Sequence, residues 1–168
     1  MRRPANRRGD RRPRDMPAHG IDRAAVEARA RFYAASKGTP FSPMRQRVLA
    51  VLGTSDKPLT AYEIVKEISD TRKVHGVEVY RALEFLLEAG CIHRLASRSS
   101  YFACDHLHGE GEAVVFMICR ECGAVHETAS ELVTRGLRGA AKTTSFRPTH
   151  SMVEVEGECA KCAAAHAI

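Results

Sequence analysis

The chain has 168 residues, of which 44% are hydrophobic, and a formal net charge of +6. This length accommodates one large domain or two small ones, and the hydrophobic content suffices for ordinary cores. The sequence shows neither an apolar run long enough to span a membrane nor an apolar N-terminal signal region. We therefore expect a cytoplasmic protein with no membrane partner.

Residues 1–20 hold most of the excess charge. They contain seven arginines and two aspartates, so they account for +5 of the net +6. Because this stretch also has three prolines and almost no apolar side chains, it is expected to be a disordered basic tail. It could attract phosphates without reading a base sequence, or it could be a solvated tail with no required role.

Two helices are predicted next. The run 21–37 is rich in alanine and arginine, and Gly38 and Pro40 stop it. A second helix begins at Ser42 and Pro43, with serine as the N-cap and proline at the first helical position, where its missing N–H costs nothing.

Two further helices carry equally clear signals. Thr60 and Glu63 form a capping box, in which each side chain accepts a hydrogen bond from the other residue's backbone N–H. The next helix follows Gly76, with apolar residues at helical spacing, and Gly90 is suited to end it.

A β-hairpin is predicted directly after these helices. The short runs 91–95 and 101–104 flank a Ser-Arg-Ser-Ser turn, which is typical of two paired strands. Helices followed by a hairpin indicate a winged helix-turn-helix DNA-binding domain, which we assign to residues 21–104.

The fourth helix of such a domain would enter the DNA groove. Tyr80 and Arg81 lie near its start, where a bidentate arginine–guanine contact contributes about 1–3 kcal/mol of discrimination. The alternative is that Arg81 pairs on the helix surface with Glu78 or Glu84.

A second, smaller domain is predicted after a hinge. Residues 105–112 are rich in glycine and histidine and form the expected hinge. Residues 113–168 are expected to form an α/β dimerisation and metal-binding domain, because so small a unit needs zinc and a partner subunit for stability. Its predicted elements are a strand at 113–118, a strand at 123–127, a helix at 130–144 and a strand at 152–155. The predicted fold class is therefore α+β.

Two C-x-x-C pairs lie in this second domain, and together they indicate one zinc site with four cysteine ligands. Thirty-six residues separate the pairs, which consist of Cys119, Cys122, Cys159 and Cys162. A thioredoxin-like redox pair is the alternative, but that motif would use one pair within a βαβ pattern, and here there are two matched pairs.

Three segments resemble a known family. The runs 79–90 (VYRALEFLLEAG), 100–104 (SYFAC) and 116–125 (FMICRECGAV) look like the ferric-uptake-regulator (Fur) family, and within it most like the zinc-uptake-regulator branch. The likeness spans residues 41–162. Members of that family are dimeric bacterial repressors that bind palindromic operators when they hold metal.

The resemblance implies a function for this chain. It would be a zinc-responsive repressor of zinc uptake genes, binding double-stranded operator DNA as a homodimer, with pairs of dimers on DNA as a further possibility. Tyr62, on the third helix, resembles a tyrosine with which family members contact phosphates or bases. A regulator of the same family that senses another metal or a redox signal is the closest alternative.

The resemblance also implies a second, regulatory zinc site, so that each subunit would hold at least two zinc ions. The iron-type regulators carry a His-His-Asp-His cluster where this chain has 114–117 (VVFM). The zinc-type positions fall instead on His93, Cys104, Glu112 and Glu127. Glu112 stands where the related regulators have histidine, so either Glu112 provides an oxygen ligand or His106 or His108 replaces it.

The position of these residues suggests how such a site would work. His93 and Cys104 precede the hinge, whereas Glu112 and Glu127 follow it. An ion bound by all four would fix one domain against the other and favour the DNA-competent state. In a dimer, that orientation sets the spacing of the two recognition helices.

Other function classes fit less well. His108-Gly-Glu110 and the first C-x-x-C echo a zinc deaminase, but only eight residues separate Glu110 from Cys119, too few for the separate helices of that site. We therefore predict that the protein is not an enzyme. A protein-interaction domain stabilised by zinc would not account for the predicted winged helix. His126 and His150 could belong to an additional metal site.

Overall fold

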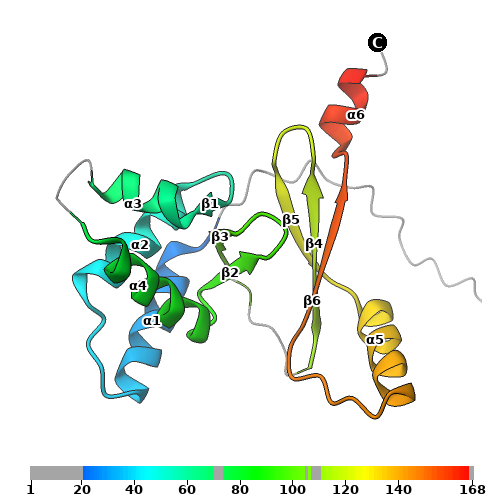
Figure 1. Cartoon of the computed structure of the whole chain (residues 1–168), viewed down its shortest axis with the longest axis horizontal. Coiled ribbons are helices and arrows are strands. Elements are labelled where there is room, and N and C mark those ends of the chain that lie inside the picture. The colour runs from blue at the N-terminus through cyan, green and yellow to red at the C-terminus, as the bar shows by residue number, and fades with distance from the viewer. Residues whose placement is uncertain (1–20, 70–73, 105, 107–110, 167–168) are drawn as a thin grey trace, which may run out of the picture.

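The computed structural model of the protein describes residues 21–69, 74–104, 106 and 111–166. The predicted basic tail lies outside these residues. Figure 1 shows two groups of elements, one containing α1–α4 with β1–β3 and the other containing β4–β6 with α5 and α6. Across the described residues, no helix is long and apolar enough to cross a membrane.

The first group combines a helical bundle with a small antiparallel sheet of order β1-β3-β2. Its helices and strands match the predicted winged helix-turn-helix, apart from the two-residue β1, which no sequence pattern indicated. They are α1 (Arg23–Ser36), α2 (Pro43–Thr54), β1 (Leu59–Thr60), α3 (Ala61–Ser69), α4 (Gly76–Glu88), β2 (Ile92–Leu95) and β3 (Ser100–Ala103).

The predicted helix ends are confirmed by their hydrogen bonds. Glu63 Oε2 accepts from the Thr60 backbone N at 2.7 Å, and the Glu63 backbone N donates to Thr60 Oγ1 at 3.2 Å. The hydrogen bonds that Glu63 Oε2 accepts from the Thr60 backbone N and from the Thr60 hydroxyl lower the pKa of the Glu63 carboxyl. At the end of α4, Gly90 adopts a φ of 64°, and the Cys91 N donates to the Leu86 carbonyl at 3.0 Å, as in a Schellman motif.

The second group is a three-stranded sheet of order β5-β4-β6, in which β5 is antiparallel and β6 parallel to the central β4. The strands predicted at 113–118 and 152–155 run longer than predicted, the strand predicted at 123–127 begins and ends two residues later, and α6 was not predicted. The elements are β4 (Ala113–Cys119), β5 (Val125–Ala129), α5 (Glu131–Thr143), β6 (Ser151–Gly157) and α6 (Ala160–His166). The mixture of helices and sheets confirms the α+β class.

Two apolar clusters hold these elements together. The larger one fills the space between α1–α4 and the first sheet. The smaller one joins the hairpin to the second sheet, because Leu95 and Phe102 pack with Val114, Phe116 and Ile118. The two groups therefore contact each other through the hairpin. Of the predicted hinge, only His106, Gly111 and Glu112 are described, so the boundaries at 105 and 112 stay predictions.

Candidate metal centres

The four cysteines of the C-x-x-C pairs meet at one end of the second sheet. Cys119 ends β4 and lies opposite Gly157 of β6 in the parallel ladder, so both strands deliver their C-x-x-C turns to the same place. The four sulfur atoms all lie within 4.8 Å of one another. This group is the predicted four-cysteine site.

The chemistry of this group suits zinc. The Cys159 backbone N donates to Cys119 Sγ at 3.4 Å, and Cys122 Sγ lies 3.8 Å from Cys159 Sγ. Hydrogen bonds from the backbone N–H groups of Cys122 and Cys159 lower the pKa of the Cys119 thiol to about 6. A sulfur that is readily deprotonated, surrounded by three more, is the donor set that Zn²⁺ takes in structural sites.

A second group of ligand-type side chains lies between the hairpin and the second sheet. His93 comes from β2, Cys104 directly follows β3, and Glu127 comes from β5. His93 Nε2 lies 3.7 Å from Glu127 Oε2, and Cys104 Sγ donates to Glu127 Oε1 at 3.6 Å. One ligand atom from each residue falls within 4.8 Å of the other two.

This second group is largely shielded from water. Only 4% of the Glu127 side chain and 12% of the His93 side chain are exposed. Burial, reinforced by the neighbouring Glu127 carboxylate, raises the pKa of the Cys104 thiol far above its ordinary value. Cys104 is therefore protonated at neutral pH here. One imidazole, one thiol and one carboxylate form a donor set that fits Zn²⁺ with fewer sulfurs than the first group.

The fourth position of this site has one described candidate close by. His106 Nδ1 lies 3.5 Å from Glu127 Oε1 and 4.0 Å from Cys104 Sγ. Among the described residues, neither His106 nor Glu112 is part of the group of three whose ligand atoms all lie within 4.8 Å of one another, and His108 lies outside the described residues. Within the described part of the chain, His126 and His150 belong neither to the four-cysteine site nor to the group of His93, Cys104 and Glu127.

The residues expected to contact DNA are on the surface of the first group. Tyr80 and Arg81 are exposed on α4, whereas Val79 on the same helix is fully buried. Tyr62 on α3 is 78% exposed. The apolar spacing of α4 thus directs Tyr80 and Arg81 to solvent, as an entering helix requires.

Sequence reasoning missed one residue of this region. Glu154 of β6 accepts hydrogen bonds from the Ala96 and Ser97 backbone N atoms in the hairpin turn, at 2.7 and 3.2 Å. The strand predicted at 152–155 gave no signal for a partner 57 residues away.

Comparisons with known proteins agree with this architecture. A model of the ferric uptake regulator family matches residues 36–156. The zinc uptake regulation protein of Escherichia coli (strain K12) is 31% identical over 136 residues, which cover 80% of this chain and 80% of that protein.

Two solved structures are similar over most of the chain. A zinc uptake regulator complexed with zinc and DNA has a TM-score of 0.78 and 29% identity, covering 88% of this chain and 99% of that chain. The structure of holo XcZur has a TM-score of 0.72 and 34% identity, covering 84% and 99%. With the family model matching from α1 to β6, the chain belongs to the ferric uptake regulator family.

Proposed function

We propose that this protein is a zinc-responsive transcriptional repressor of zinc uptake genes. It binds double-stranded palindromic operator DNA as a homodimer when it holds zinc. The similarity to the zinc uptake regulation protein of Escherichia coli and to the regulator complexed with zinc and DNA supports this assignment. Each subunit has two zinc sites, a structural four-cysteine site and a regulatory site.

One observation carries the proposal. His93 and Cys104 belong to the hairpin side, Glu127 belongs to the second sheet, and their ligand atoms lie within 4.8 Å of one another. A cation held by all three binds tightly only while hairpin and sheet are together. Zinc therefore favours this closed arrangement by its higher affinity for it.

The charges of the site explain why a cation is needed. In this structure the protonated Cys104 thiol donates to Glu127. A ligating thiolate would place a negative charge next to that carboxylate, and the two would repel. Bound Zn²⁺ supplies the positive charge that offsets both.

The closed arrangement also fixes the DNA-binding surface. In a two-fold dimer, the position of each first group sets the distance between the two copies of α4, which must match half-sites one helical turn or a multiple apart. We assign the DNA contacts to Tyr62, Tyr80 and Arg81, which are exposed on α3 and α4.

Arg81→Ala is expected to weaken binding to the operator by about 5- to 150-fold, because a bidentate base contact contributes about 1–3 kcal/mol. Zinc content should be unchanged. The measurement is fluorescence anisotropy at saturating zinc, with an operator selected from random duplexes and a scrambled duplex beside it. Arg135→Ala, an exposed arginine on α5, is the matched control. Equal operator affinity for both variants would remove Arg81 from the interface.

We assign the fourth regulatory ligand to His106, because of its short distances to Glu127 and Cys104. His106→Ala is expected to raise the free zinc needed to half-fill the second site by about tenfold or more, whereas Glu112→Gln and His108→Ala leave it unchanged. Competition with a zinc chelator of known affinity measures this. If His106→Ala leaves the required free zinc unchanged and Glu112→Gln or His108→Ala raises it, the fourth ligand is Glu112 or His108 instead.

The function itself is tested by operator binding against buffered free zinc, iron and manganese, together with the metal content of the purified protein. We expect a steep zinc threshold. Operator affinity that is independent of zinc would contradict the proposal, and a threshold for iron or manganese would assign the protein to another metal.

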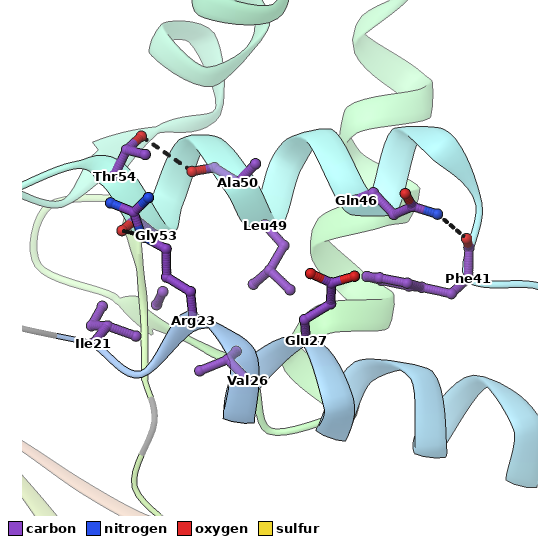
Figure 2. A pocket seen from close by; sticks show the side chains of 11 residues that line it. Ile21, Arg23, Val26, Glu27, Phe41, Gln46, Leu49, Ala50, Gly53 and Thr54 are labelled. Atoms are coloured by element: carbon purple, nitrogen blue, oxygen red, sulfur yellow. Dashed lines mark hydrogen bonds between the residues drawn. The ribbon is translucent and has the colours of Figure 1, made fainter.

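We further propose that the protein is not an enzyme and acts in the cytoplasm, where operator DNA lies. Figure 2 shows side chains that line a cavity between α1 and α2. The cavity has a volume of about 290 Å³ and 11 lining residues. None of these described residues is a cysteine or histidine. Its two charged residues are already engaged, since Arg23 donates to the Gly53 carbonyl at 2.8 Å and Glu27 pairs with Arg31 at 2.6 Å. Turnover of a substrate without DNA would overturn this proposal.

A further inference from the structure

Three residues form one row across the second sheet. Glu127 of β5 and Glu154 of β6 both lie opposite Phe116 of β4. Side chains directly opposite one another in a sheet point to the same face. That face is turned to the hairpin, because the Phe116 ring lies 5.2 Å from the rings of His93 and Phe102.

The two ends of this row contact the hairpin in different ways. At one end, Glu127 belongs to the candidate regulatory metal site. At the other end, Glu154 Oε1 accepts from the Ala96 N at 2.7 Å, and Oε2 accepts from the Ser97 N at 3.2 Å and from the Ser97 hydroxyl. The carboxylate thus binds the turn of the hairpin through three donors without any metal.

The state of Glu154 agrees with this contact. Partial burial, the largest influence, acts to raise the pKa of Glu154, but the hydrogen bonds from Ser97 and Ala96 together lower it. The side chain is therefore ionised at neutral pH, and its hydrogen bonds are charge-assisted, which makes them stronger than neutral ones.

A neighbouring arginine extends the contact. Arg98, in the same turn, donates from Nη2 to the Cys119 carbonyl at 3.2 Å, and its Nη2 lies 3.9 Å from Glu156 Oε1. The turn of the hairpin is thereby attached to β6 and to the end of β4. In this arrangement polar groups of Ala96, Ser97 and Arg98 contact the second sheet.

We infer that Glu154 is a positioning residue, forming a metal-free latch between the hairpin turn and β6 that sets the zinc concentration at which the protein responds. The inference rests on the proposed function. Contacts made only in the closed arrangement raise the fraction of protein that is closed before zinc binds. The apparent zinc affinity rises with this fraction. Glu154 is not among the regulatory ligands, so its removal changes the threshold and leaves the ligand set intact.

The test compares Glu154→Gln with the wild type in operator binding against buffered free zinc. The glutamine keeps the size of the side chain but loses its charge. We expect half-maximal binding at about tenfold higher free zinc, equivalent to about 1.4 kcal/mol. Operator affinity at saturating zinc and the zinc content of the four-cysteine site should be unchanged. Glu131→Gln, an exposed glutamate on α5, is the matched control.

A second readout examines the latch directly in zinc-free regulatory sites. Amide hydrogen exchange at Ala96 and Ser97 should be slow in the wild type and faster in Glu154→Gln. Ser97→Ala removes only the hydroxyl, and it should shift the zinc threshold in the same direction but add little to Glu154→Gln.

The outcomes separate the two proposals. If the wild type needs zinc for operator binding and Glu154→Gln has the same threshold, the latch is refuted. If the wild type binds operator equally with and without zinc, the proposed function fails, and hydrogen exchange still decides whether the latch exists. Unchanged exchange at Ala96 and Ser97 in the variant would overturn the inference in either case.

Discussion

Replacing Cys104 with serine is expected to abolish zinc-dependent operator binding while the dimer stays folded. Cys104 provides the thiol of the His93–Cys104–Glu127 group, and a serine hydroxyl does not ionise near neutral pH. Changes in the shell outside the ligands already cost about 10- to 100-fold in metal affinity, so loss of a ligand should exceed about 100-fold. A gel-shift titration against buffered zinc measures the effect.

The control for this variant is Cys91→Ala. Cys91 is also buried, but its thiol donates to the Val26 carbonyl at 3.6 Å and belongs to neither metal group among the described residues. It should keep the wild-type zinc threshold. A Cys104→Ser protein that retains the full zinc response would exclude Cys104 as a regulatory ligand.

Much of the fold was readable from local signals. The capping box at Thr60 and Glu63 and the left-handed Gly90 each depend on residues adjacent in the chain, so their geometry follows from side-chain chemistry alone. The four-cysteine site was equally readable, because each C-x-x-C turn brings its own two sulfurs together and zinc needs four ligands.

The regulatory site depends on distant contacts that no local pattern contains. His93 and Glu127 are far apart in the chain, and only the family resemblance suggested that they meet. The structure places His93 Nε2 3.7 Å from Glu127 Oε2, a distance set by the packing of Phe116 against the His93 ring.

Short or edge elements were missed for a related reason. The two residues of β1 pair with β3, and Glu154 reaches a turn in the other group, so both are defined by partners far along the chain. The helix α6 has no buried residue, and therefore no apolar periodicity that a sequence pattern could reveal.

The second large effect is expected for Cys122→Ser. This change should remove the structural zinc, and the second group of elements should then unfold or the dimer should dissociate. The buried apolar side chains of that group come almost entirely from β4, since β6 and α6 contain no buried residue and α5 buries only Thr134. Structural zinc contributes about 10–16 kcal/mol to the folding of small zinc peptides, which is comparable with the whole stability of a typical domain, about 5–15 kcal/mol.

Zinc stoichiometry, analytical ultracentrifugation and thermal unfolding measure this outcome. We expect about one zinc fewer per subunit, loss of the dimer and loss of the cooperative transition of residues 111–166. Glu121→Ser, an exposed change in the same C-x-x-C turn, should behave as wild type. A stable Cys122→Ser dimer with unchanged zinc content would show that the four cysteines do not hold the ion. In that case the dimer would have to be stabilised without the four-cysteine zinc site, by the apolar side chains exposed on α5 and β6, including Leu132 and Met152.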